Sequence, residues 1–287
     1  MRRLAVIAGG LAALIAGCAG LRSRGDDPAN TPARAAQRRQ WSQSAQEAMD
    51  CKDWPLAEAE LRRLLADDPR SVDAHHRLGL VVQAQGRLAE AETAQRKALA
   101  LDPDYVDALI GLADVEACLG RLDQALSNID QAIDIDPKRT EPYLAEGRVL
   151  EAQGRRDEAL AAYFRVIEHD PASTPAMARV ANLQLAAGQA DQALARLDGA
   201  IELEPDEPAL RHLRGRAHLA LHHPAEALND LQLAAERLPD QPDLLCDLAL
   251  ALDASKRPAD ALKAAERALK LAPDSAVARS LSHQFRR

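Results

Sequence analysis

His218, His222 and His223 form the densest group of residues in this sequence that could bind a metal. His218 and His222 are four residues apart, so both would face the same side of a helix. No cysteine or carboxylate stands in register with them as a third ligand, whereas protein zinc sites use at least three protein ligands. We interpret His218 as a core residue and His222 as a turn residue, and we expect neither a metal nor a cofactor.

The sequence also lacks the common catalytic motifs. It contains no glycine-rich phosphate loop and no Gly-x-Ser-x-Gly, His-Glu-x-x-His or Cys-x-x-Cys motif. The acid pairs Asp26-Asp27 and Asp67-Asp68 are typical of solvated turns. A net charge of -8 and an aromatic content of 2% argue against binding to phosphate backbones or stacked bases. We therefore expect no enzyme activity, no nucleic-acid partner and no small-molecule substrate.

Cys18 is the residue whose setting predicts covalent chemistry. Arg2 and Arg3 precede an uncharged apolar stretch, residues 4–17, which is short for a membrane span and has the length of a secretory signal. The end of this stretch, Ile15-Ala16-Gly17-Cys18, resembles the lipobox of bacterial lipoproteins. The resemblance implies cleavage before Cys18 and acylation of its thiol. An ordinary signal peptide or an uncleaved anchor, with Cys18 there by chance, is the alternative.

The segment after Cys18 is expected to act as a spacer. Residues 1–17 are predicted to be a lipoprotein signal peptide. Residues 18–37 are predicted to be the anchor cysteine and a flexible tether, because they contain Gly, Pro, Asn and Asp without an apolar period. Residue 19 is Ala rather than Asp, which resembles the class sorted to the outer membrane in Gram-negative bacteria. The expected location is thus a membrane surface facing the periplasm.

The rest of the sequence repeats at an interval of 34 residues. Three series of residues keep this interval without a gap. They are Pro69, Pro103, Pro137, Pro171, Pro205, Pro239 and Pro273; Ala57, Ala91, Ala125, Ala159, Ala193, Ala227 and Ala261; and Gly86, Gly120, Gly154 and Gly188. A fixed period of this length indicates stacked repeats, each of which is one supersecondary unit.

This pattern resembles the tetratricopeptide repeat family. The second repeat shows the signature best, with Leu78-Gly79, Gly86, Ala91, Ala98 and Leu101-Asp102-Pro103. The resemblance implies an all-α fold, a right-handed α-solenoid of about seven helix–turn–helix repeats over residues 38–273, with a capping helix over residues 274–287. In each repeat a helix A and a helix B would be joined by a short turn.

The repeated residues have physical reasons in such a fold. The glycines would take a positive φ where helix A ends, and His222 and Lys256 replace them in repeats six and seven. The alanines would lie where helix B crosses helix A, where a larger side chain would overpack. The prolines would end helix B. Val277, Leu281 and Phe285 would form the apolar stripe of the capping helix.

In this family helix A lines a concave face that binds peptides or protein segments. Counting from the first residue of each repeat (38, then every 34th residue), positions 2, 5, 9 and 12 should face inward. The predicted partner-binding residues are His76, Leu80, Ile110, Asp114, Leu144, Arg148, Asn182, Leu185, His212, Arg216 and Leu219. Their mixture favours an extended or helical segment with apolar anchors. Alternatively, these residues only pack between neighbouring A helices.

The remaining cysteines, Cys51, Cys118 and Cys246, fall in different repeats. A disulfide needs α-carbons within about 7 Å, so we expect free thiols, with Cys118 in the core and Cys246 exposed. The whole pattern predicts a lipid-anchored adaptor of the bacterial envelope that binds a protein or peptide partner, for instance in pilus or secretion-system assembly. The alternative is an accessory or regulatory subunit of a cell-wall or polysaccharide-synthesis enzyme complex.

Overall fold

The computed structural model describes residues 31–286 and consists, over this range, of helices without strands. The prediction of an all-α helical repeat fold is therefore confirmed. Cys18, the predicted signal peptide and most of the predicted tether lie outside the described residues. Within residues 31–286, no helix combines the length and the apolar character that a membrane span requires.

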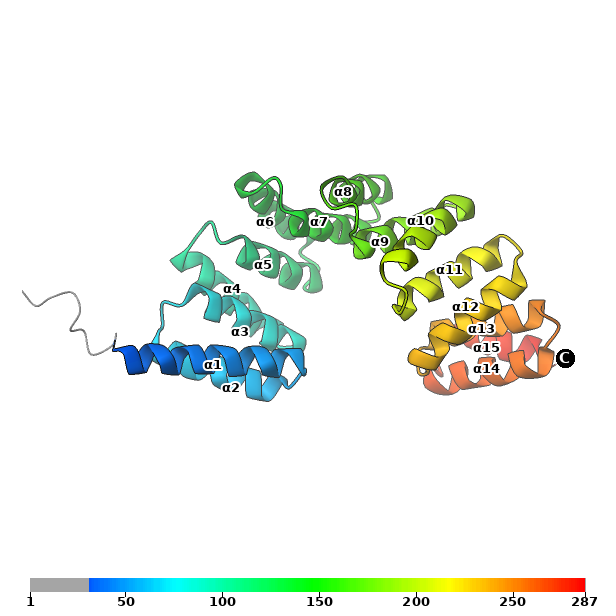
Figure 1. Ribbon diagram of the computed structural model, residues 1–287, viewed down its shortest axis with the longest axis horizontal. Coiled ribbons are helices and arrows are strands. Elements are labelled where there is room, and N and C mark those ends of the chain that lie inside the picture. Colours follow the sequence, from blue (N-terminus) through cyan, green and yellow to red (C-terminus); the bar gives the residue numbers. More distant parts are fainter. Residues whose placement is uncertain (1–30, 287) are drawn as a thin grey trace, which may run out of the picture. The chain divides into compact units, whose positions relative to one another are not determined.

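Helices A and B alternate along the chain (Figure 1). The A helices are α1 (Pro32–Asp50), α3 (Val72–Ala84), α5 (Val106–Cys118), α7 (Thr140–Ala152), α9 (Thr174–Ala186), α11 (Pro208–Ala220) and α13 (Pro242–Ala254). The B helices are α2 (Trp54–Asp67), α4 (Leu88–Leu101), α6 (Leu122–Ile135), α8 (Arg156–His169), α10 (Ala190–Leu203), α12 (Pro224–Arg237) and α14 (Pro258–Leu271). A last helix, α15 (Ala276–Gln284), follows them.

The helices form two compact units, with α1–α4 in the first and α5–α15 in the second. The boundary between the units lies between Tyr105 and Val106. Within each unit, every A helix packs against its own B helix, every A helix after the first also packs against the B helix before it, and α15 packs against α13 and α14 (Figure 1). The core of the second unit is accordingly divided into small apolar clusters between neighbouring helices.

The end of helix B is stabilised by the residue before the repeated proline. In the second repeat Asp102 caps α4: its N–H donates to the carbonyl of Ala98, and its carboxylate accepts from the N–H of Asp104 at 3.1 Å. Asp136 and Asp170 make the same side-chain contact at 3.1 Å. The carboxylate therefore satisfies the backbone of the turn, while the proline prevents the helix from continuing.

The turn from helix A to helix B uses one residue in the left-handed region. Gly86, at the end of α3, has a φ of 79°, as predicted, and the other three glycines of the series also have positive φ. His222 and Lys256 occupy the same conformation, with φ of 59° and 60°. Lys52 does so as well, with φ of 59°. A residue with a Cβ is strained there, so these three turns carry a conformational cost.

The crossing of helix A and helix B requires small residues on both helices. All seven alanines of the repeated series are fully buried, as predicted. On helix A, Gly147 faces Tyr163 of α8, and a Cβ added to Gly147 would lie 2.3 Å from Cε1 of the Tyr163 ring. Gly215 of α11 faces Leu231 of α12 in the same way. These repeats therefore pair a glycine on helix A with a large side chain on helix B.

Both ends of the described chain differ from the sequence-based expectation. Helix α1 begins at Pro32, so the last part of the predicted tether (18–37) is helical. The Thr31 side chain accepts from the N–H of Arg34, and proline is favourable at a first helical position.

At the other end, Ser275 caps α15 and sets its register. Ala278 and Leu281 are consequently buried, whereas Val277 is 59% exposed. The prediction that Val277 belongs to the apolar stripe was therefore wrong. Phe285 does pack against the cluster that contains Leu281.

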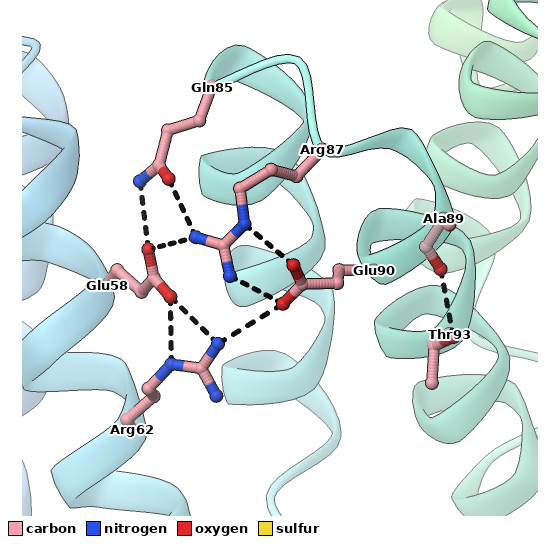
Figure 2. A network of polar contacts seen from close by, with 7 residues as sticks. All are labelled: Glu58, Arg62, Gln85, Arg87, Ala89, Glu90 and Thr93. Atoms are coloured by element: carbon pink, nitrogen blue, oxygen red, sulfur yellow. Dashed lines mark hydrogen bonds and ion pairs between the residues drawn. The ribbon is translucent and has the colours of Figure 1, made fainter.

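A polar network joins α2 to the turn between α3 and α4 in the first unit (Figure 2). Glu58 accepts hydrogen bonds from Arg87 at 2.7 Å, from Arg62 at 2.9 Å and from Gln85 at 3.0 Å. Arg87 also donates to Glu90 at 2.8 Å. Burial alone would raise the pKa of Glu58, but these hydrogen bonds outweigh it and lower the pKa to about 2.

This network makes the stability of the first unit depend on pH. The ordinary pKa of Glu58 is 4.5, so the unfolded chain takes up a proton first as the pH falls. The stabilisation is present above pH 4.5 and is lost progressively as the pH falls towards about 2. We expect Glu58→Gln to flatten the loss of stability below about pH 4.5, measured as the urea midpoint at each pH.

The matched control is Glu47→Gln, because Glu47 is an exposed acid on α1 of the same unit. This variant should retain the pH profile of the unmodified chain. Identical profiles for Glu58→Gln and the unmodified chain would contradict the assignment of this pH dependence to Glu58.

Candidate partner-binding surface

The predicted partner-binding residues lie on the A helices, and in the second unit their polar members pair from one repeat to the next. Arg148 of α7 donates to Asp114 of α5 at 2.8 Å. Arg216 of α11 donates to Asn182 of α9 at 3.1 Å. In both pairs the two residues occupy position 9 of repeats that follow one another, so the repeat interval itself creates the contact.

Asp247 of α13 extends this pairing towards the end of the unit. Its Oδ2 atom lies 2.7 Å from His212 Nε2 and 3.8 Å from Arg216 Nε. The side chains of Arg148 and Arg216 nevertheless remain 37% and 40% exposed. Both arginines therefore remain accessible to solvent while they are paired.

The apolar members of the predicted set are half-buried. Ile110, Leu144, Leu185 and Leu219 each pack against a core cluster. Packing between helices thus explains the buried part of each side chain, and the rest faces solvent. We use the term A-helix face for the following residues of the second unit: Ile110, Asp114, Leu144, Arg148, Asn182, Leu185, His212, Arg216 and Leu219.

The first unit places the predicted residues differently. His76 is buried, and its Nδ1 atom lies 3.0 Å from Oε1 of Gln95, so His76 belongs to the core and not to an open surface. Leu80 is half-buried. Arg77, which sequence analysis did not single out, donates to Gln46 at 3.1 Å and thereby joins α3 to α1. In the sequence, Arg77 stands at position 6 of its repeat, next to position 5, which was predicted to face inward.

Two of the predictions for cysteines were wrong. Cys118 is exposed, because it is the last residue of α5. Cys246 is 4% exposed and packs in the cluster that contains Leu281, and burial raises the pKa of its thiol. The described cysteines are free, as expected.

His218 is half-buried, and burial lowers its pKa. Its Nδ1 atom is buried without a hydrogen-bond partner in the structure. His222 lies in the turn, as predicted. Over residues 31–286, no group of three or more His, Cys, Asp or Glu residues is arranged to hold a metal ion.

Two cavities that the sequence did not predict lie between successive B helices. The first has a volume of about 470 Å³ and lies between α2, α3 and α4, with Leu65, Leu78 and Val82 among its lining residues. The second has a volume of about 320 Å³ and lies at the equivalent place between α6, α7 and α8, with Glu146 at the position of Leu78. The only sequence signal was a charged residue at position 7 of repeat four.

The helix pairs, their interval and the small residues at their crossings define a class of repeat protein. Family models described as tetratricopeptide repeat match residues 70–138, 119–172, 150–217 and 242–275. The matched residues together make up more than half of the chain, so the chain belongs to the tetratricopeptide repeat family. No curated protein matches it in sequence.

Solved structures share this fold at low sequence identity. In the APC/C hetero-tetramer Cut9–Hcn1, a chain matches with a TM-score of 0.72 and 18% identity over 80% of this chain and 48% of that one. PilF of Pseudomonas aeruginosa matches with a TM-score of 0.66 and 19% identity over 74% and 97%. PilW, a widely conserved type IV pilus biogenesis factor, matches with a TM-score of 0.62 and 21% identity over 72% and 96%.

This chain thus spans about half the length of the APC/C subunit that it matches and nearly all of PilF and PilW. At such identities the likeness shows the fold alone.

Proposed function

We propose that this chain is a non-enzymatic adaptor whose A-helix face holds a segment of a protein partner. The observation that carries this proposal is the series of half-exposed pairs, Arg148 with Asp114 and Arg216 with Asn182, beside half-buried leucines. A segment with alternating acidic and apolar residues would engage both features, since its carboxylates can pair with the arginines while its apolar side chains cover the leucines.

We propose that Cys18 is acylated and anchors the chain to a membrane. The proposed location is the outer membrane, with the repeats on the periplasmic side. The support is the lipobox resemblance in the sequence. Residues 19–31 separate Cys18 from the start of α1. At roughly 3.5 Å per residue, such a segment spans about 45 Å when fully extended. Confinement of this kind raises the effective concentration of a partner on the same membrane without any new contact.

A role in pilus or secretion-system assembly is proposed by analogy. The supporting observation is that the chain shares its fold with PilF and PilW over most of their length. Because many functions use one fold, the proposed process rests on this analogy, whereas the proposed binding of a partner rests on the A-helix face.

Charge reversal tests the A-helix face. The test measures photo-crosslinking from a probe at position 182 to a partner in whole envelopes. In the double variant Arg148→Glu with Arg216→Glu, we expect this crosslinking to fall by roughly tenfold or more. The reason is that the new carboxylates would repel the carboxylates of the partner segment. The control variant is Arg156→Glu with Lys270→Glu, which reverses two exposed charges on B helices. Unchanged crosslinking in the first variant, with an intact helical circular dichroism spectrum, would exclude the A-helix face as the binding site.

Substitution of the anchor residue tests the membrane proposal separately. We expect Cys18→Ser to abolish incorporation of labelled fatty acid in growing cells, because serine lacks the thiol that is acylated. The control is Cys51→Ser, which removes an exposed thiol of the described chain and should leave labelling unchanged. Normal labelling of Cys18→Ser would show that the lipobox resemblance is misleading.

A further inference from the structure

The cavity between α6, α7 and α8 in the second unit has an unusual lining. Its volume is about 320 Å³, and it combines apolar residues with five charged ones. The charged residues are Asp130, Glu146, Arg155, Glu158 and Arg165. The equivalent cavity between α2, α3 and α4 has Leu78 at the place of Glu146. The lining of this cavity therefore has a carboxylate where the equivalent cavity has a leucine.

Glu146 has no partner for the oxygen that is most deeply buried. Its Oε2 atom is inaccessible to solvent and forms no hydrogen bond in the structure. Burial, which is the largest influence, raises the pKa of Glu146, and the neighbouring charge of Asp130 acts in the same direction. Glu146 as a whole is half-buried, and leaving one of its buried oxygens without a partner is costly, so the hydrogen-bonding capacity of this carboxylate is not satisfied.

The two arginines of the lining are engaged elsewhere. Arg155 donates to both oxygens of Glu158, at 2.7 Å and 2.5 Å. The guanidinium of Arg165 lies 5.7 Å from the centre of the Tyr143 ring. The charge of Arg165 acts on Glu146 from a distance and lowers its pKa, but no described residue forms an ion pair with Glu146 or Asp130.

The equivalent place in repeat six is filled by an arginine of the chain itself. There, position 7 is Arg214 of α11, which donates to Asp230 of α12 at 2.7 Å and 2.8 Å. Arg214 also donates to Asp198 of α10 at 3.0 Å. Asp198 occupies the position that Asp130 occupies in repeat three. The space between two successive B helices thus accommodates a guanidinium group between acids.

Repeat four keeps the acid of the preceding B helix and lacks the arginine. Glu146 stands at the position of Arg214, and Ala162 stands at the position of Asp230, so the space that Arg214 and Asp230 fill in repeat six is open. We propose that this cavity binds an arginine side chain of a partner protein, with Glu146 and Asp130 accepting its hydrogen bonds. Bidentate pairing of a guanidinium with a carboxylate favours arginine over lysine.

This site lies between B helices, so it is independent of the A-helix face, and the two proposals can fail separately. The test uses the purified full chain with isotopically labelled leucine methyl groups. The probe is N-acetyl-arginine methylamide, and the comparison compound is its citrulline counterpart, which has nearly the same shape without the charge. We expect the arginine probe to shift the methyl signals of Leu126 and Leu150, which line the cavity, in a saturable way, and the citrulline compound not to do so.

Variants connect this binding to the two carboxylates. We expect Glu146→Gln and Asp130→Asn each to lower the affinity for the arginine probe by at least about tenfold. Glu146→Leu restores the residue type of Leu78, so it should abolish binding while the chain stays folded. Glu168→Gln is the matched control, because Glu168 is an exposed acid of α8 that does not line the cavity, and it should bind the probe unchanged.

Three results would overturn the proposal. The first is equal shifts with the citrulline compound, and the second is unchanged affinity in Glu146→Gln. The third is binding that appears only after Arg165→Gln, which would show that Arg165 itself fills the cavity in solution.

Discussion

Gly147→Ala is expected to lower the free energy of unfolding by about 3 kcal/mol, at the upper end of the usual cost of overpacking. The added Cβ would lie 2.3 Å from the ring of Tyr163. That ring is fully buried, and its hydroxyl donates to Glu151, so it has no room to move away. The measurement is hydrogen exchange along the chain, because the loss should centre on repeat four in a protein whose repeats couple to their neighbours.

A second substitution should rescue this loss. In repeat five the same two positions are Ala181 and Leu197, both fully buried. The double variant Gly147→Ala with Tyr163→Leu recreates that pair, so it should be more stable than Gly147→Ala alone. Gly199→Ala is the control, because Gly199 lies inside α10 with open space around it, and it should gain about 0.5–1 kcal/mol. Additive effects of the two substitutions would contradict the proposed clash.

Asp230→Ala is expected to cost about 3 kcal/mol, because it removes one member of a buried ion pair. Asp230 is 1% exposed and accepts two hydrogen bonds from Arg214, which also raise the pKa of that guanidinium. Its carboxylate lies 3.5 Å from Arg211 as well. Without Asp230, Arg214 keeps only the half-exposed carboxylate of Asp198. Urea unfolding, together with hydrogen exchange in repeats five to seven, measures this loss.

The matched control is Asp198→Ala, which removes the more exposed acid from the same arginine and should cost less than about 1 kcal/mol. The double variant Asp230→Ala with Arg214→Leu recreates the Leu78 and Ala94 pair of repeat two. It should recover most of the lost stability, since an apolar pair can replace a buried ion pair of similar volume. Equal losses in Asp230→Ala and Asp198→Ala would show that burial does not decide the strength of this pair.

Much of the fold followed from the repeat interval. The three series of proline, alanine and glycine predicted where helix B ends, where the helices cross and where the backbone takes a positive φ, and the structure confirms these roles at Ala159, Gly86 and Gly154. Such residues are predictable because their roles depend on local backbone geometry and on a contact that every repeat makes in the same way.

Single positions within a repeat were less predictable. Cys246 was expected at the surface and is buried, whereas Cys118 and Val277 were expected in the core and are exposed. The repeat interval does not determine the burial of Cys118, which ends α5, or of Val277, which lies in α15 outside the repeats. Cys246 is buried because it packs in one cluster with residues of α15. A change of one residue in register there turns a side chain by about 100° around the helix.

The sequence by itself determined the repeat class, the ends of the B helices and the glycine turns, because these depend on interactions within a few dozen residues. Only the tertiary structure decided which polar side chains meet. The pairing of Arg148 with Asp114, the burial of His76 against Gln95 and the open cavity at Glu146 each depend on side chains from two or three different helices. Their contacts arise from the way neighbouring helices pack, which the repeat interval alone does not give.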